Sequence, residues 1–194
     1  NPRSGRMTAS LGTSGTLAAW SGEAVVDPAG EIAAFCDSSG AWLPLLCTMN
    51  VTVATEQLRH LFDWSHDAMD AAIARTPAGA DGLLFLPYLQ GERIPNLPDA
   101  RGSLHGMSPR NGTAGHLARA TMEGVTLGMA YGLKRLKQLG MTAGEIRLVG
   151  GGSRSPLWRQ LCADVFGTPV ATMKNPEGAA LGAAIQALAA VRTE

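Results

Sequence analysis

The sequence predicts a mixed α/β fold, and three observations support this class. Residues 7–36 contain short apolar runs separated by turn residues, which is typical of a strand meander. The stretch Thr113 to Leu139 has apolar residues at helical spacing. Residues 145–191 then alternate strand and helix patterns, which indicates an α/β layer at the end of the chain. With 194 residues, 45% of them hydrophobic, the chain is long enough to bury one core.

The first half of the chain reads as a meander followed by helices and an irregular segment. Apolar runs predict strands at 7–11, 17–20, 24–26 and 32–36. Helical spacing follows at 49–62 and 66–75, and a compact apolar strand at 82–86. Residues 87–112 hold four of the eleven prolines, so we expect a long functional loop there.

The helix from Thr113 to Leu139 is the strongest structural prediction. Thr113 is a suitable N-cap, and Gly140 stands where a left-handed C-terminal cap belongs. Gly124 and Gly128 each cost about 1 kcal/mol relative to alanine, so we expect a close contact at both. One face is predicted to be buried, with Ala118, Met122, Val125, Met129, Leu133 and Leu136.

The last elements are a strand at 145–149, a helix at 155–166, a strand at 169–173 and a helix at 178–191. Ser155 and Pro156 read as the cap and first residue of their helix. The last helix is rich in alanine and too short to cross a bilayer, so we expect it to be buried. Trp158 is expected in the core.

Two glycine turns are the features most suggestive of chemistry. Gly150-Gly151-Gly152-Ser153 joins a strand to a capped helix, which lets a flat ligand lie against bare backbone and places unpaired amides near a phosphate. Such a turn suits a nucleotide, but it also occurs in α/β proteins without any ligand. The second turn, Leu11 to Thr16, lies between two short strands far away in sequence.

Composition and spacing exclude several classes of protein. The 16 basic and 16 acidic residues balance, and no basic cluster is present, so binding to nucleic acid is not expected. The three cysteines, Cys36, Cys47 and Cys162, are expected to be buried free thiols in a reducing compartment, which indicates the cytoplasm. The sequence lacks a P-loop, a dinucleotide-binding fingerprint and a nucleophile elbow. The four histidines show no metal-ligand spacing, and His60 and His66 are expected on a helix surface.

The stretch Gly102 to Met107, eight intervening residues and then His116 to Glu123 resemble the second signature of the FGGY carbohydrate kinases. The two glycine turns and the stretch Asn175 to Ala184 occur in that family's order, and the resemblance covers essentially the whole chain. It implies an actin-like (ribonuclease H-like) ATPase fold, with residues 1–194 forming the C-terminal of two domains. The stretches Leu11 to Thr16 and Asn175 to Ala180 are most similar to those of the branch that uses ATP to phosphorylate D-xylulose.

The resemblance also implies roles for individual residues. Gly12 and Thr13 match the family's phosphate-binding hairpin, with Ser14 adjacent, and Gly106 matches a second phosphate contact. Gly151, Gly152 and Ser153 match the adenosine loop, and Asn175 is expected to close the adenine pocket. Each glycine has the alternative of serving a tight turn. Mg²⁺ is expected to arrive with the nucleotide, and no metal is expected to be held by the protein.

The resemblance places the general-base aspartate of the reaction shortly before the first glycine turn, and residues 1–9 contain no Asp or Glu. The base is therefore expected upstream, in or near an N-terminal domain that would also supply the sugar pocket, and the chain alone is expected to be inactive. Three questions stay open: the sugar (ribulose, gluconate or glycerol as alternatives), a non-catalytic actin-like module, and a homodimer through the meander edge or the loop near residue 95. Four charged residues of that loop are expected to form an ion-pair network: Glu92, Arg93, Asp99 and Arg101.

Overall fold

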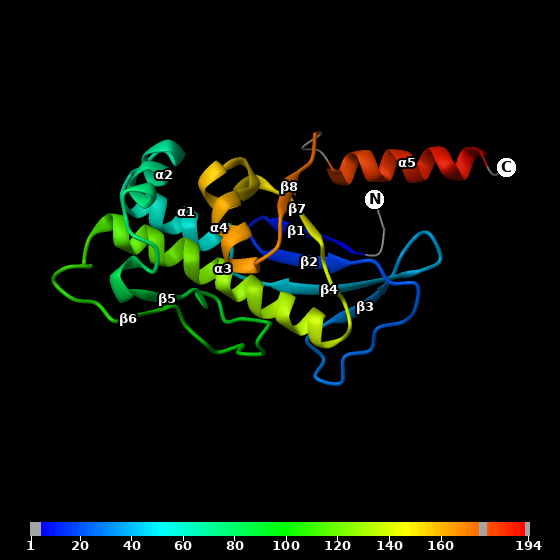
Figure 1. Ribbon diagram of the computed structural model, residues 1–194, viewed down its shortest axis with the longest axis horizontal. Coiled ribbons are helices and arrows are strands. Elements are labelled where there is room, and N and C mark those ends of the chain that lie inside the picture. Colours follow the sequence, from blue (N-terminus) through cyan, green and yellow to red (C-terminus); the bar gives the residue numbers. More distant parts are fainter. Residues whose placement is uncertain (1–4, 175–177, 193–194) are drawn as a thin grey trace.

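A six-stranded mixed sheet forms one half of the molecule in the computed structural model, which describes residues 5–174 and 178–192 (Figure 1). The strand order is β3-β4-β2-β1-β7-β8. The first four strands pair antiparallel, whereas β7 pairs parallel with both β1 and β8. The strands are β1 (Arg6–Leu11), β2 (Gly15–Ala19), β3 (Ala33–Cys36), β4 (Trp42–Thr48), β7 (Glu145–Val149) and β8 (Val170–Thr172).

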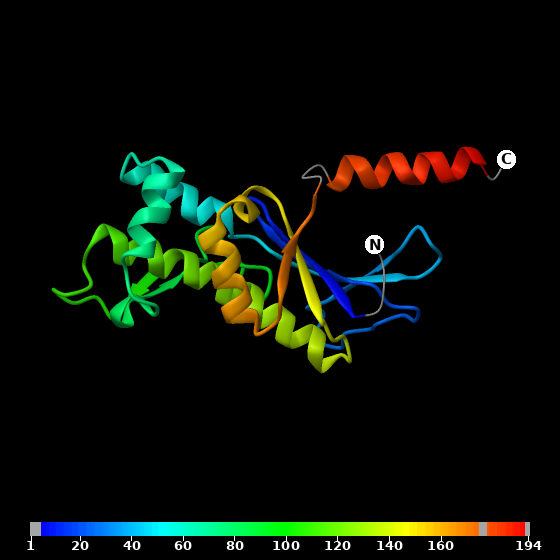
Figure 2. The same cartoon turned by 45° about the horizontal axis from the view of Figure 1, so that its top comes forward.

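The long helix α3 (Ala114–Gln138) crosses one face of this sheet and continues beyond it (Figures 1 and 2). The Thr113 hydroxyl accepts a hydrogen bond from the His116 backbone N–H, which confirms the predicted cap. All six apolar residues predicted for its inner face are buried. Helix α4 (Pro156–Phe166) packs on α3 and β8. The sheet and these two helices therefore share one core, in agreement with the predicted α/β class.

A smaller, mostly helical part surrounds the N-terminal half of α3. It consists of α1 (Thr52–Leu61), α2 (His66–Ala74), the short 3₁₀ helix η1 (Ala80–Gly82) and the hairpin β5 (Leu84–Leu86) and β6 (Ser103–His105). Both α2 and β5 contact α3. Because α3 belongs to both parts, it fixes the small part against the sheet at the place where β1 and β7 end (Figure 2).

Three elements differ from the sequence prediction. Residues 24–26 are not a strand, whereas Trp42–Thr48 forms β4, which the pattern did not indicate. Proline at position 44 obscured that strand; it lies outside the stretch from Leu45 to Thr48 that pairs with β2, so the sheet tolerates it. The segment 87–112 was expected to be irregular throughout, but it contains β6.

Helix α5 (Gly178–Arg192) forms where predicted, but its large apolar side chains are exposed, so the prediction that it is buried is wrong. It lies apart from the rest of the ribbon in both views (Figures 1 and 2). Alanine-rich composition favours a helix but does not define what the helix packs against. The Gln186 side chain donates a 2.7 Å hydrogen bond to the Ser38 hydroxyl.

The cysteines and helix glycines were predicted only in part. All three thiols are free, but Cys36 is exposed on the edge strand β3, and Cys47 is half-buried. Cys162 is buried, and burial raises the pKa of its thiol to about 12. A Cβ atom on Gly124 would lie 2.2 Å from the Phe85 carbonyl oxygen, which confirms a close contact, whereas the space beside Gly128 is open. Within the described ranges, no helix is both long and apolar enough to traverse a bilayer.

Candidate functional site

The two glycine turns meet at Leu11, the last residue of β1. Because β1 and β7 are parallel neighbours with Ser10 opposite Val149, the residues that follow the two strands leave the sheet at the same edge. A Cβ atom on Gly150 would lie 2.7 Å from the Leu11 carbonyl oxygen, and one on Gly152 would lie 2.9 Å from the Leu11 Cβ. Only glycine permits this approach at these two positions.

The hairpin Gly12-Thr13-Ser14 is held by the start of α1. The backbone N–H of Thr52 donates to the Gly12 carbonyl at 2.9 Å, and that of Val51 donates to the Thr13 carbonyl at 3.1 Å. Within the part of the chain that the structure describes, the backbone N–H groups of Gly12 and Thr13 find no hydrogen-bond acceptor. Adjacent unpaired N–H groups in a turn form a binding place for an anion such as a phosphate.

A cavity of about 480 Å³ opens between helices α1 and α2 of the small helical part and the turn that joins β7 to α4. Gly151 and Gly152 line one side, and Thr52, the residue that holds the hairpin, lines another. A volume of this size suits a ligand as large as a nucleoside. Its remaining lining comes from Thr55, Glu56, His66, Asp67, Met69, Asp70, Met122, Arg154, Ser155, Pro156 and Trp158.

Hydrogen bonds join the two walls of this cavity. The Ser155 hydroxyl, which caps α4, donates to the Asp70 carboxylate of α2 at 2.6 Å. The Trp158 indole N–H donates to the Thr126 hydroxyl at 2.9 Å, and the ring is buried, so the expected core role is confirmed. Sequence reasoning singled out neither Thr52 nor Asp70, because both lie within ordinary helical patterns.

The structure brings together some of the predicted nucleotide-binding residues. Gly151 and Gly152 line the cavity. Gly12 and Thr13 lie beside it, because Thr52, which lines the cavity, donates a hydrogen bond to the Gly12 carbonyl. Ser153 instead lines a neighbouring cavity on the other side of the same turn, and its hydroxyl donates to the Gly150 carbonyl at 2.7 Å.

The other three predicted residues do not line the main cavity. Ser14 is exposed at the tip of the hairpin. Gly106 has a φ of +77° at the end of β6, and the Asn111 side chain donates to its carbonyl at 2.9 Å. The prediction for Asn175 lies outside the described residues.

The loop after β5 is held differently from the prediction. Glu92 is buried, and its carboxylate accepts hydrogen bonds from the backbone N–H groups of Met49 and Arg93 and from the Asn50 side chain. Arg101 donates to the carbonyl groups of Asp99 and Ala100. The predicted ion-pair network is therefore wrong, because hydrogen bonds to the main chain take its place.

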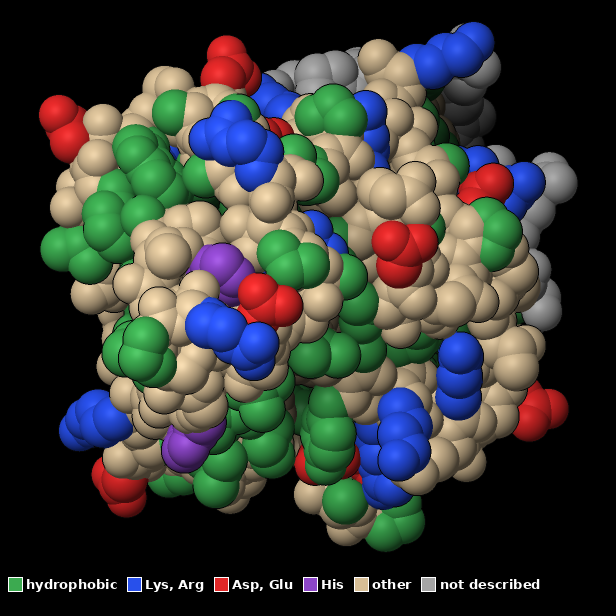
Figure 3. Space-filling model, turned by 60° about the vertical axis from the view of Figure 1, so that its left-hand side comes forward, with side chains coloured by type: hydrophobic (Ala, Val, Ile, Leu, Met, Phe, Trp, Pro, Cys, Tyr) green, Lys and Arg blue, Asp and Glu red, His purple; other side chains and the backbone are tan. Residues whose placement is uncertain are grey.

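Charge is mixed on the surface near the small helical part. In Figure 3, basic and acidic side chains are scattered among apolar ones over the face that it shows. The side chains of His60 and His66 are both 72% exposed, as predicted. Among the described residues, no three or more His, Cys, Asp or Glu side chains are grouped so that they could hold a metal ion.

The chain is similar to known proteins over nearly its whole length. Over 188 residues the chain is 42% identical to xylulose kinase of Haemophilus influenzae, covering 97% of this chain and 38% of that protein. The crystal structure of xylulose kinase from Bifidobacterium adolescentis superposes with a TM-score of 0.87 at 34% identity, covering 99% of this chain and 38% of that one. Ligand-bound xylulose kinase from Lactobacillus acidophilus gives a TM-score of 0.91 at 27% identity, covering 98% and 39%.

These relatives confirm the actin-like α/β fold that the resemblance implied. The chain spans well under half of the length of each of these relatives. The family description "FGGY family of carbohydrate kinases, C-terminal domain" matches residues 7–191. The chain therefore belongs to the FGGY family of carbohydrate kinases, and residues 7–191 correspond to that family's C-terminal domain.

Proposed function

We propose that this chain binds ATP in the cavity between its two glycine turns and, together with a second domain, transfers the γ-phosphate to D-xylulose to form D-xylulose 5-phosphate. One observation carries the proposal: the turn that begins at Gly150 packs against Leu11, the residue that directly precedes the Gly12 turn 138 positions earlier, and this meeting point lies beside the cavity. Bare main chain on one wall of the cavity suits a flat base, and the unpaired N–H groups of the hairpin beside it suit phosphates.

Different residues contact different parts of the nucleotide. Gly151 and Gly152 contact the adenosine, with Ser153 beside them. We also assign Asn175, which is not among the described residues, to the adenine pocket. Gly12 and Thr13 hold the β- and γ-phosphates through their unpaired N–H groups and the Thr13 hydroxyl, with Ser14 next to them and Gly106 as a second contact. Donors at these positions stabilise the charge that develops on the transferring phosphoryl group.

Mg²⁺ would bridge the phosphate oxygens and neutralise part of their charge. Of the three carboxylates that line the cavity, Glu56, Asp67 and Asp70, Asp70 is engaged by Ser155 and Glu56 by Arg59. We therefore assign the ion to the incoming nucleotide rather than to a protein-held site. The donors available in the hairpin, backbone N–H groups and a hydroxyl, suit phosphate oxygens better than a bare cation.

The acceptor and the base are assigned to a second domain. The relatives that cover this chain are named xylulose kinase, and each is more than twice as long as the matched region. A carboxylate that takes the proton of the sugar hydroxyl is required for the transfer. We place it, with the sugar pocket, in an N-terminal domain that would be the main partner of this one, so that the chain alone is inactive.

We also place the protein in the cytoplasm, since its three thiols are free, and we infer that a homodimer would form at the edge strand β3, whose four residues are exposed.

Two measurements test the proposal. Calorimetric titration of ADP with Mg²⁺ into the chain should give saturable one-to-one binding, and a chain that binds no nucleotide would contradict the proposed site. A coupled assay on the full-length protein should show higher kcat/KM for D-xylulose than for ribulose, gluconate or glycerol. If the protein prefers another of these sugars, the proposed nucleotide site stands and the proposed substrate is wrong. If it binds nucleotide but turns over none of these sugars, the non-catalytic module is favoured.

A further inference from the structure

Glu92 is a buried charged residue that has no role in the nucleotide site described above. It belongs to the loop that follows Tyr88, and it is only 3% exposed. A buried carboxylate costs free energy unless hydrogen bonds compensate its lost hydration. In the part of the chain that the structure describes, no Lys, Arg or His lies within ion-pair distance of Glu92, so hydrogen-bond donors stabilise it instead.

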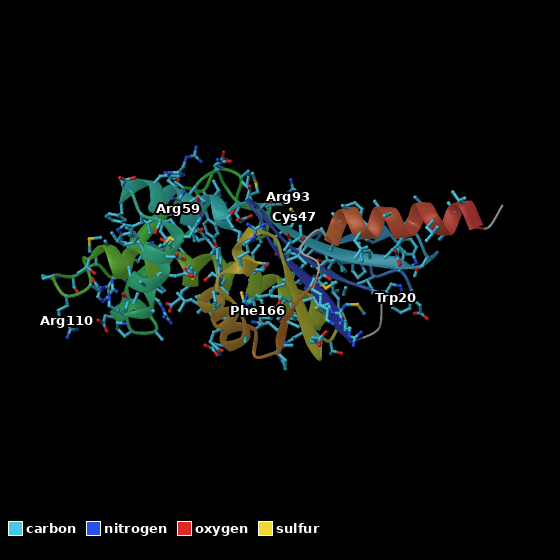
Figure 4. All side chains as sticks on the ribbon, turned by 90° about the horizontal axis from the view of Figure 1, so that it is seen from above. Trp20, Cys47, Arg59, Arg93, Arg110 and Phe166 are labelled. Atoms are coloured by element: carbon cyan, nitrogen blue, oxygen red, sulfur yellow. The ribbon has the colours of Figure 1, made fainter. Side chains whose placement is uncertain are left out.

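The donors come from the segment that joins β4 to α1. The Met49 backbone N–H donates to Glu92 Oε1 at 2.7 Å, and the Asn50 side-chain amide donates to Oε2 at 3.1 Å. The same Asn50 amide donates to the Gly91 carbonyl at 2.7 Å. Asn50 is itself 2% exposed, so these contacts are shielded from water and are strong. Figure 4 labels Arg93, which follows Glu92 in the loop, and Cys47, which belongs to the strand β4 that leads to Met49.

The next two residues of this segment hold the phosphate hairpin. Val51 donates its backbone N–H to the Thr13 carbonyl, and Thr52 donates to the Gly12 carbonyl. One short piece of main chain, residues 49–52, is thus fixed by Glu92 on one side and fixes the hairpin on the other. Only two peptide units separate Met49 from Val51, so we expect a shift of Met49 to disturb the hydrogen bond between Val51 and the Thr13 carbonyl.

We propose that Glu92 is a positioning residue for phosphoryl transfer, which acts through Asn50 and residues 49–52 to fix the hairpin Gly12-Thr13 at the triphosphate. It does not touch the nucleotide. The inference rests on the proposed function, since it assigns the hairpin to the phosphates. Misplacement of a catalytic donor by about 1 Å can cost up to roughly a hundredfold in rate, so even a partial loss of this support should be measurable.

Glu92→Gln in the full-length protein is the main test. Glutamine keeps one acceptor oxygen for the two backbone N–H groups, but it turns an amide donor toward the Asn50 amide, which is also a donor. We expect kcat to fall roughly tenfold and the affinity for ATP to fall, while adenosine, which makes no phosphate contact, binds within about twofold of wild type. Asn50→Ala cuts the link from the other side and should give the same pattern. Asp99→Asn, an exposed acid on the same loop, is the matched control and should change nothing.

The outcomes separate this inference from the proposed function. If wild type binds neither adenosine nor ATP, the proposed function fails and the role of Glu92 fails with it. If wild type is active and Glu92→Gln keeps its kcat and its affinity for ATP, Glu92 only anchors the loop and the inference is wrong. Equal losses for adenosine and ATP would also overturn it, because they report a general disturbance of the fold. If Glu92→Gln fails to fold, the ratio of the adenosine and ATP affinities of Asn50→Ala decides the question alone.

Discussion

The backbone N–H of Thr52 lies 2.9 Å from the carbonyl oxygen of Gly12, and the Thr52 side of α1 also lines the cavity that Gly151 and Gly152 border. A helix start therefore connects the hairpin to the second glycine turn. Together with the hydrogen bond from the Val51 N–H to the Thr13 carbonyl, this contact links the hairpin of the sheet to the small helical part.

Gly151 and Gly152 should respond differently to substitution. A Cβ atom on Gly151 meets nothing within 4 Å, so Gly151→Leu places its side chain in open space at the cavity. We expect ADP affinity to fall roughly tenfold or more, or at least about 1.4 kcal/mol, with the melting temperature unchanged. Calorimetry and a thermal melt check this, and an unchanged dissociation constant would remove this face of Gly151 from the adenosine site.

Gly152→Ala is the counterpart of that substitution. Its Cβ would lie 2.9 Å from the Leu11 Cβ and 2.9 Å from the Trp158 ring, both in the core. Overpacking of this kind costs about 1–3 kcal/mol, so the melting temperature should fall. Urea unfolding followed by tryptophan fluorescence measures the loss. Wild-type stability would show that the turn can move away from Leu11.

Thr13→Ala in the full-length protein should lower kcat by roughly ten- to a hundredfold, the loss expected for one donor to the transition state. The Thr13 side chain is exposed, so the fold should be unaffected. Steady-state kinetics with D-xylulose and ATP provide the measurement, and Thr8→Ala, at an exposed position of β1, provides the control. Unchanged kcat would exclude the Thr13 hydroxyl from the reaction.

Asp27 should make the stability of the domain depend on acid pH. Its buried carboxylate pairs with Arg135 and accepts backbone N–H bonds, and the Arg135 guanidinium, more than the other contacts, holds its pKa well below the usual 3.8. A depressed native pKa stabilises the fold above the unfolded value, so this stabilisation is complete at neutral pH and is lost as the pH falls below about 4.

Asp27→Asn tests this pair. The variant should lose about 1–3 kcal/mol in the free energy of unfolding at pH 7, because donors of Arg135 and the loop lose their acceptor. The difference from wild type should shrink as the pH falls from about 4 toward 2. Urea titrations across this range measure it, with Glu23→Gln at an exposed position as control. A difference that stays constant with pH would mean that the charge of Asp27 is not what matters.

Two glycines of α3 offer a matched pair. Gly124→Ala would bring a Cβ 2.2 Å from the Phe85 carbonyl oxygen, so α3 and β5 would have to separate and the domain should be destabilised. Gly128→Ala meets no atom within 4 Å and should stabilise the domain by about 0.5–1 kcal/mol through helix propensity. Melting temperatures should therefore shift in opposite directions, and a parallel shift would contradict the close contact at Phe85.

The sequence by itself determined the elements whose signals lie within a few residues. Thr113 and Ser155 cap their helices through hydrogen bonds to residues three positions on, and Gly140 ends α3 with a φ of +84°. The buried face of α3 followed from spacing alone, because a helix places every third or fourth side chain on the same side. The family resemblance, which the comparisons confirm, likewise depends on short motifs in a fixed order.

Only the tertiary structure decided which distant residues meet. Glu92 accepts a hydrogen bond from Met49, 43 positions earlier, and Ser155 donates one to Asp70, 85 positions earlier. No local sequence pattern predicts either pair. Helix α5 formed as its composition predicted, yet its large side chains are exposed. The physical reason is common to these cases: conformational preference acts over one or two turns of chain, whereas burial and long-range hydrogen bonds depend on how α3 and the sheet pack together.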